Sequence, residues 1–417
     1  MSRRDSGAPA RTLFKNATVV NPVDGDVVGE ARVLVEGDRI LEVGGSDVRA
    51  DGAHTIDVAG RFLMPGLVDA HVHVNAATAD LTAQADWAGS YVTAHAARIM
   101  AGMLERGFTT VRDVAGADFG LAAAVDEGLL TGPRLVFGGK ALSQTGGHGD
   151  PRPAGRQVID DHPCAAALSL VVDGAEEVRR GARAQLRTGA HHLKIMLSGG
   201  VASLTDRVDS VQFSEDEITA AVEEASAAHR YVTGHAYTAQ AINRGLRLGV
   251  RCIEHGNLLD QTSLDLFLRH DAFLVPTLVT YERLAAEGPE QGLPPASAAK
   301  VKDVLDAGLG ALEDAHRAGV NLAFGTDLLG GMHRWQCEEF RIRAQVQSAA
   351  DVLRAATSNA ARLLNMEGQI GVVAPGAYAD LLVVEQNPLD DVTTLARPEK
   401  HLRLVMARGR VHTARLD

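Results

Sequence analysis

Cysteine is scarce in this sequence. The 417 residues include three cysteines, Cys164, Cys252 and Cys337. An odd number of widely separated cysteines argues against a disulfide framework. The absence of a Cys-x-x-Cys pair also argues against a zinc site built from thiolates. The cysteine content therefore favours a protein of the reducing cytoplasm.

Long apolar runs and an excess of basic residues are also missing. No run approaches the ~20 apolar residues that cross a bilayer, and the arginine-containing first 15 residues lack the apolar core of a secretory signal. The net charge is −12, from 53 acidic and 41 basic side chains. Nucleic acids and anionic membranes bind basic surfaces, so neither is expected as a partner.

Short β-strands are predicted at both ends of the chain, separated by Asp/Gly turns. Near the N-terminus the expected strands are Leu13–Val20, Ala31–Val35, Arg39–Val43 and a stretch over His54–Met64. Near the C-terminus they are Ala379–Glu385 and Leu402–Ala407. Two β-rich ends around a different middle indicate a small β domain built from both termini.

The middle of the chain alternates short apolar runs with helical patterns, which favours parallel βα units. Credible helices cover Ala175–Thr188 and Glu215–His229, the second with a capping-box start at Ser214. Eight strands are expected, the number in a closed barrel. They are Leu67–His73, Thr109–Val114, Leu135–Gly139, Leu193–Leu197, Tyr231–His235, Arg251–His255, Phe273–Thr277 and Leu322–Thr326.

Metal-binding residue types stand at the ends of these apolar runs. His71 and His73 lie two residues apart on one predicted strand, so both imidazoles point to the same face. His235, His255 and Asp327 end three later runs. A parallel barrel gathers such side chains at one rim. Imidazole with carboxylate suits zinc and similar divalent ions.

The segment Pro-Gly-Leu-Val-Asp-Ala-His-Val-His at 65–73, followed in order by the later candidate ligands, resembles the amidohydrolase superfamily over nearly the whole chain. The resemblance implies an α/β fold: a distorted (β/α)8 TIM barrel over residues 67–369. A composite β-sandwich would be built from residues 1–66 and 370–417. Relatives usually form homo-oligomers, so a homo-oligomer is expected.

The resemblance also implies the metal centre and its chemistry. The implied ligands of two divalent ions, with zinc the first choice, are His71, His73, Lys194, His235, His255 and Asp327. Lys194 would be carboxylated by carbon dioxide to a bridging carbamate, and without this modification a single ion is the alternative. A metal-bridging hydroxide would attack the substrate carbonyl, and Asp327 would shuttle the proton to the leaving nitrogen. No Gly-x-Ser-x-Gly elbow supports a serine nucleophile instead.

Three further segments resemble the Xaa-Pro dipeptidase (prolidase)-like and ochratoxinase-like branch. They are Gly-Gly-His-Gly-Asp at 146–150, Ser-Gly-Gly-Val-Ala-Ser at 198–203, and Tyr237. Enzymes of that branch cleave amides next to a free amino-acid carboxylate, so the expected substrate is a dipeptide or an N-acyl amino acid. His148 would contact the reacting carbonyl as an oxyanion donor, and Tyr237 would bind the substrate. The loop at Gly200 and Val201 would offer backbone N–H groups to an anion. The plainer alternatives are packing at the rim for Tyr237 and loop flexibility for the glycines.

Other interpretations stay open at this stage. A cyclic amide hydrolase, like imidazolonepropionase or dihydroorotase, would use the same metal ligands. A non-catalytic scaffold is disfavoured because every expected ligand is present. Arg207 either pairs with a substrate carboxylate or belongs to a solvated charge run. Arg112 and Asp113, adjacent on a predicted strand, are expected to form an internal salt bridge.

Overall fold

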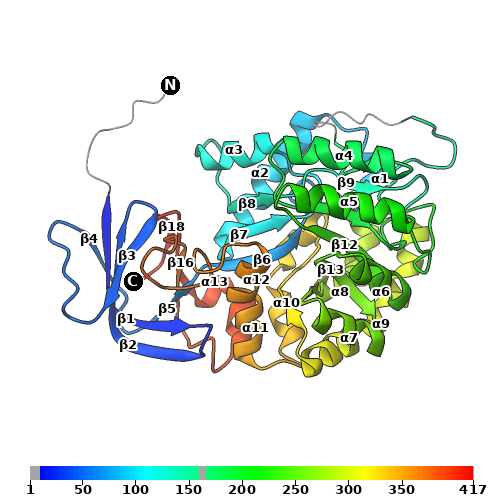
Figure 1. Cartoon of the computed structure of the whole chain (residues 1–417). Coiled ribbons are helices and arrows are strands. Elements are labelled where there is room, and N and C mark those ends of the chain that lie inside the picture. Colours follow the sequence, from blue (N-terminus) through cyan, green and yellow to red (C-terminus); the bar gives the residue numbers. More distant parts are fainter. Residues whose placement is uncertain (1–9, 159–165, 417) are drawn as a thin grey trace.

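The structure is a computed structural model that describes residues 10–158 and 166–416 (Figure 1). Cys164 lies outside these residues, whereas Cys252 and Cys337 are buried free thiols. Figure 1 shows a β-rich body that contains both ends of the described chain, beside a larger body of strands and helices.

The β-rich body is one sheet of eight strands, in the order β18-β17-β16-β5-β1-β2-β3, with β4 beside β1. Its strands are β1 (Arg11–Asn21), β2 (Asp26–Glu36), β3 (Arg39–Gly44), β4 (His54–Asp57), β5 (Phe62–Pro65), β16 (Leu381–Val384), β17 (Leu402–Ala407) and β18 (Arg410–Ala414). Antiparallel pairing of β16 with β5 joins the two ends of the chain. The predicted terminal strands are confirmed, except that the stretch 54–64 forms two strands and β18 was not foreseen.

The larger body contains two parallel sheets. The first consists of β6 (Leu67–Val72), β7 (Phe108–Asp113) and β8 (Arg134–Phe137). The second has the order β10-β9-β11-β12-β13-β14-β15. Its strands are β9 (Ala141–Ser143), β10 (Ser169–Val171), β11 (Leu193–Met196), β12 (Val232–Thr238), β13 (Cys252–Leu258), β14 (Phe273–Val275) and β15 (Asn321–Leu322). The parallel βα units predicted from the sequence are therefore present.

The two parallel sheets meet without a continuous hydrogen-bonded ladder between them. On one side the chain passes directly from β8 into β9 through residues 138–140. On the other side Ala70 N donates to Phe324 O at 2.7 Å, and Asp327 N donates to His71 O at 2.9 Å.

Only the start of the expected eighth strand is regular. Phe324 N donates instead to Ala355 O outside the sheet, which interrupts the strand pattern.

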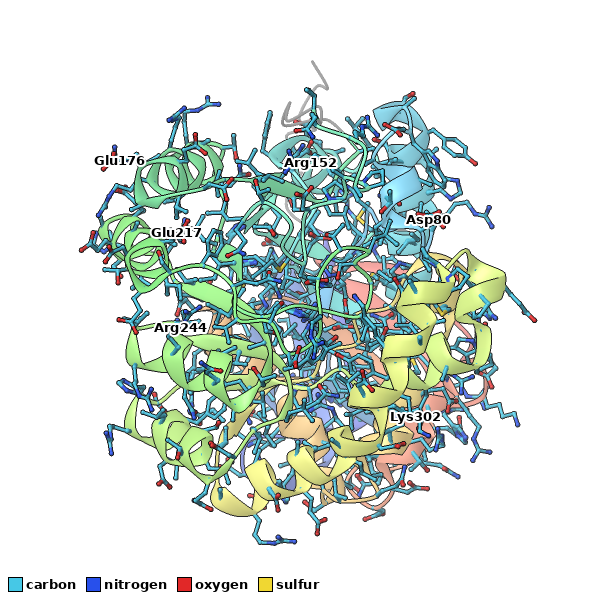
Figure 2. The ribbon with its side chains drawn as sticks, turned by 90° about the vertical axis from the view of Figure 1, so that its right-hand side faces the viewer. Asp80, Arg152, Glu176, Glu217, Arg244 and Lys302 are labelled. Atoms are coloured by element: carbon cyan, nitrogen blue, oxygen red, sulfur yellow. The ribbon has the colours of Figure 1, made fainter. Side chains whose placement is uncertain are left out.

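Helices surround the parallel sheets. They are α1 (Leu81–Gln84), α2 (Gly89–Glu105), α3 (Phe119–Asp126), α4 (Ala175–Arg187), α5 (Glu215–Ala227), α6 (Ala239–Arg247), α7 (Gln261–Arg269), α8 (Leu278–Glu287), α9 (Pro295–Ala318), α10 (Glu338–Arg343), α11 (Ala349–Ala355), α12 (Ser358–Leu363) and α13 (Pro398–His401). Glu176 on α4, Glu217 on α5 and Arg244 on α6 follow one another along one edge, and Lys302 on α9 lies across the molecule (Figure 2).

Local sequence signals explain where the helices begin. Ser214 and Glu217 form the predicted capping box at the start of α5, in which each side chain binds the backbone of the other residue. The helices expected over 175–188 and 215–229 match α4 and α5 within two residues. Among the described residues, no helix combines the length and apolar character needed to cross a membrane.

Candidate active site

Four predicted ligands form a row of histidines at the ends of parallel strands. His71 lies near the end of β6, and His73 directly follows this strand. His235 and His255 lie in β12 and β13. The ring centroids are 5.3 Å apart for His71 and His73, 4.9 Å for His71 and His255, and 4.7 Å for His255 and His235. Side chains from distant parts of the sequence are thus brought together, as the strand-end pattern predicted.

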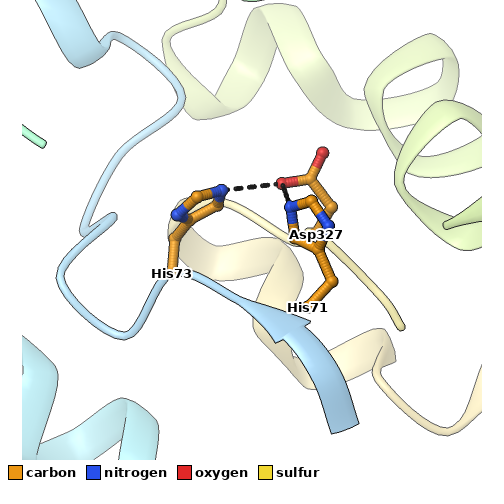
Figure 3. Close-up of side chains that lie close together, drawn as sticks. All are labelled: His71, His73 and Asp327. Atoms are coloured by element: carbon orange, nitrogen blue, oxygen red, sulfur yellow. Dashed lines mark ion pairs between the residues drawn. The ribbon is translucent and has the colours of Figure 1, made fainter. Parts of the chain in front are cut away.

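Asp327 completes a group that can hold a metal ion. Its Oδ1 lies 3.3 Å from His71 Nε2 and 3.1 Å from His73 Nε2 (Figure 3). The ligand atoms of these three residues all lie within 4.8 Å of one another. Burial acts to raise the pKa of the Asp327 carboxyl, but the charges of His71 and His255 and the hydrogen bonds from His71 and His73 together hold it well below its usual range. An ionised carboxylate between two imidazoles is a donor set that suits a divalent cation.

Each of the four histidines has one ring nitrogen fixed by the protein. The bonds join His71 Nδ1 to Glu254 (2.6 Å), His73 Nδ1 to Ala115 O (3.0 Å), His255 Nδ1 to Thr277 Oγ1 (2.8 Å) and His235 Nε2 to Gly199 O (3.1 Å). Hydrogen bonds of this kind fix the tautomer and orientation of metal-ligating histidines. They leave Nε2 of the first three rings and Nδ1 of His235 available to a metal.

Two candidate ligands have unusual backbone conformations. His255 has a φ of 72° and Asp327 a φ of 52°. Both values lie in the left-handed region of backbone conformation, which residues other than glycine adopt infrequently. Such strain clusters at functional sites, where the surrounding structure enforces it. Asp327 is held in place by the bond from its N–H to His71 O. The strain supports a functional role for both positions.

Lys194 is buried on β11, the strand that pairs with the His235 strand β12. Burial lowers the pKa of Lys194 to about 8, although the charges of Glu254 and Asp327 act in the opposite direction. A substantial fraction of this amine is therefore neutral near pH 8. The neutral amine is the form that can react with carbon dioxide.

A buried ion pair lies behind His71. Glu254, the residue before His255, accepts a hydrogen bond from Arg112 Nη2 at 2.6 Å, and both side chains are fully buried. The expected pairing of Arg112 with Asp113 is wrong, because neighbouring residues on a strand point to opposite faces. Asp113 instead accepts the backbone N–H groups of Val74 and Ala117. No sequence motif pointed to this role of Glu254.

A cavity opens beside the histidines. Its polar lining includes His73, His148, Ser203, His235, Tyr237, Tyr281 and Asp327, and its apolar lining includes Leu81, Ala115, Leu168, Met196, Val201, Leu284 and Leu329. Metal-type ligands and the predicted substrate-binding residues therefore share one space. Such a cavity is the expected location of an active site.

His148 stacks on the candidate ligand His235, with ring centroids 4.1 Å apart and planes inclined by 23°. Its Nδ1 lies 3.1 Å from Ser203 Oγ. Burial lowers the pKa of His148 to about 4, so the resting ring is neutral. Its Nε2 faces a substrate as an acceptor when Nδ1 carries the proton, or as a donor when Nε2 carries it.

Tyr237 lies on the other side of His235, with the ring centroids 4.8 Å apart. Its hydroxyl accepts a hydrogen bond from the hydroxyl of Tyr281 at 3.0 Å. Burial raises the pKa of Tyr237, so the phenol keeps its proton. Tyr281, from α8, was not identified from the sequence because no motif surrounds it.

The N–H of Gly200 donates to Asp206 Oδ2, a carboxylate of the protein itself, at 3.1 Å. Binding of a substrate anion by this loop stays a prediction. A Cβ at Gly200 would lie 2.1 Å from the ring of His148, so glycine is needed for this close packing. Val201 lines the cavity. Arg207 is 83% exposed and pairs with Asp209, which matches a solvated charge run.

Comparison with known proteins agrees with this geometry. The model of the amidohydrolase family matches residues 62–411. Ochratoxinase of Aspergillus niger is 31% identical over 411 residues, which cover 94% of this chain and 84% of the relative. A prolidase structure in complex with N-methylphosphonate-L-proline is 47% identical, with a TM-score of 0.95 and coverage of 97% and 100%. A Xaa-Pro dipeptidase structure with bound methionine is 28% identical, with a TM-score of 0.87 and the same coverage.

The buried ion pair predicts a large effect of Arg112→Met on stability. The substitution leaves Glu254 buried without its cation, which costs about 3–5 kcal/mol of the free energy of unfolding. Urea-induced unfolding measures this loss. The control is Arg207→Met, which removes an exposed pair and should leave the unfolding curve unchanged. Equal curves for the two variants would contradict the importance of the buried pair.

Proposed function

Because this chain belongs to the amidohydrolase family, in its prolidase- and ochratoxinase-like branch, we propose that it is a metal-dependent hydrolase of dipeptides or N-acyl amino acids. That it hydrolyses amide or peptide bonds follows from the family and its relatives. The observation that carries the finer proposal is the cavity that His73 and Asp327 share with His148 and Tyr237, with His71 grouped beside Asp327. In this proposal the two parallel sheets make up a distorted (β/α)8 barrel over residues 67–369. The described residues on either side of it, 10–66 and 370–416, would make up the composite β-sandwich.

The donor set fits a pair of divalent ions. His71, His73 and Asp327 would hold one ion, and His235 with His255 would hold the other. Lys194, once carboxylated, would supply an anionic bridge between them. Four imidazoles with carboxylate oxygens suit zinc, which is our first candidate. When bound, such ions polarise the substrate carbonyl and lower the pKa of a water molecule that attacks it.

Asp327 would move the proton in this reaction. Its carboxylate is ionised in the resting protein and lies beside both His71 and His73. It can therefore accept a proton from the attacking water and deliver that proton to the nitrogen of the leaving amine. This transfer makes the amine a neutral leaving group.

Tyr237 and His148 would orient the substrate. Since the hydroxyl of Tyr281 donates to that of Tyr237, the proton of Tyr237 is left to bind the carboxylate of the substrate. His148 would contact the oxygen of the reacting carbonyl from its position over His235. Together they would hold the scissile bond beside the ligands.

The first prediction concerns the substrate carboxylate. Amidation of that carboxylate removes its charge and should lower kcat/KM by about tenfold to a hundredfold, since charged hydrogen bonds contribute roughly 1.5–3 kcal/mol. In Tyr237→Phe the difference in kcat/KM between the free-acid substrate and the amidated substrate should become smaller. The control Tyr91→Phe changes an exposed tyrosine and should keep the full difference. Equal rates on both substrates, or a preference for cyclic imides, would favour the cyclic amide hydrolase instead.

The second prediction concerns the carbamate. Protein prepared with ¹³C-bicarbonate should show a carbamate carbon resonance that is absent from Lys194→Ala. The variant should also lose metal and activity, and short carboxylic acids should partly restore both by replacing the missing anion. Lys302→Ala, an exposed substitution on α9, is the control that should keep the resonance. Two bound metals and full activity with a bare Lys194 ammonium would rule the carbamate out.

The third prediction concerns Asp327. Asp327→Asn should keep the fold and most of the metal but lower kcat at least a hundredfold, since general acid–base steps contribute roughly 10²–10⁴. Circular dichroism and metal analysis check the first two expectations, and steady-state kinetics the third. A variant that keeps a third of the wild-type rate would exclude Asp327 as the proton carrier.

A further inference from the structure

Asp206 is a buried carboxylate outside the proposed metal centre. It lies in the loop between β11 and α5, and its side chain is 2% exposed. Oδ1 accepts a hydrogen bond from Ser203 Oγ, and Oδ2 accepts from Gln212 Nε2 at 2.8 Å and from Gly200 N at 3.1 Å. A buried carboxylate with this many donors has one fixed position.

Two of these donors connect Asp206 to His148. Ser203 has a single hydroxyl proton, for which Asp206 Oδ1 and Gly200 O both lie within hydrogen-bond distance, and the charged carboxylate is the stronger acceptor. A lone pair of Ser203 Oγ then accepts the N–H at Nδ1 of His148, 3.1 Å away. The amide of Gln212 makes the second connection, because its Oε1 accepts the backbone N–H of His148 at 2.9 Å. Asp206 thus fixes both the ring and the backbone of His148.

Lys300, on α9, fixes this loop from the outside. Its ammonium group donates to the carbonyl oxygens of Gly200 (3.1 Å), Ser203 (2.9 Å) and Asp206 (2.7 Å). It also lies 3.4 Å from Asp206 Oδ1, so the buried negative charge has a cation beside it. The loop that contacts His148 is therefore attached to a helix of 24 residues.

We propose that Asp206 is a positioning residue that acts through Ser203 and Gln212 to hold His148 beside the scissile bond, with Lys300 as its counter-ion. This inference rests on the proposed function, since it assigns His148 a place beside the scissile bond. The absence of a side chain at Gly200 supports it, because a Cβ there would collide with the imidazole. The ring of His148 is confined between this loop and His235, so a loss of the hydrogen bond to Ser203 frees its rotation.

The test is a double-mutant cycle with a spectroscopic readout. Ser203→Ala and Asp206→Asn should each lower kcat by about tenfold or more, while in a His148→Ala background either change should cost less than about twofold. Both variants should bind as much metal as the wild type. Binding of a phosphonate analogue of the substrate should weaken in parallel with kcat, because its tetrahedral group mimics the attacked carbonyl.

The ring of His148 can be followed without any substrate. In protein labelled with ¹⁵N-histidine, the Nδ1 resonance of His148 should shift in Ser203→Ala and Asp206→Asn. The control is Ser297→Ala, which removes a buried serine that donates to the carbonyl of Ser203 but has no bond to the ring. It should leave both the resonance and the rate unchanged.

The outcomes distinguish a failure of the proposed amide hydrolysis from a failure of the positioning role of Asp206. If the wild-type protein hydrolyses no amide while the resonance shifts as expected, the proposed function fails and the positioning of His148 stands. The positioning role of Asp206 is overturned if the resonance is unchanged in both variants. It is also overturned if the losses of kcat in Ser203→Ala and Asp206→Asn add fully to the loss in His148→Ala. Ser203→Ala removes a single oxygen atom, so it keeps the test valid if Asp206→Asn does not fold.

Discussion

The charge of Glu254 is the constraint on which the candidate site depends. Its carboxylate receives hydrogen bonds from His71 Nδ1 and Arg112 Nη2, each at 2.6 Å, and from the hydroxyl of Thr233. Arg112 also donates to Ala70 O at 2.5 Å, in the strand that carries His71. A buried carboxylate without partners costs several kcal/mol, so folding requires these groups to meet. The orientation of a candidate metal ligand is thereby tied to the stability of strands β6, β7, β12 and β13.

A second buried carboxylate orients a histidine in the cavity. His148 is held by Asp206, and Asp206 is held by Lys300. Both networks combine a buried carboxylate, a cation and a histidine. Fixed polar groups of this kind cost no reorganisation during a reaction, which favours catalysis in a site with little water. The apolar lining at Leu81, Leu284 and Leu329 provides such an environment.

The sequence predicted the elements and the ligands better than it predicted the supporting contacts. His71 and His73 were identifiable because side chains two apart on a strand share a face, and because parallel strands end at one rim. Glu254 and Arg112 were not, since their pairing joins positions 142 residues apart and no motif marks it. Asp206 was not identified either, since it directly precedes Arg207, for which a solvated charge run was one interpretation, yet Asp206 is buried while Arg207 is exposed. The eighth strand was overestimated because its backbone bonds are divided among three partners, Leu274, Ala355 and β6.

In the proposed function, four histidines, Asp327 and a modified Lys194 hold two divalent ions that act together on an amide. The decisive experiment is titration of the metal-free protein with zinc, with hydrolysis of an N-acyl amino acid measured at each addition. We expect activity to be absent without metal and to reach its maximum at two equivalents of zinc per chain. Full activity in the metal-free protein, or a maximum at one equivalent, would contradict this proposal.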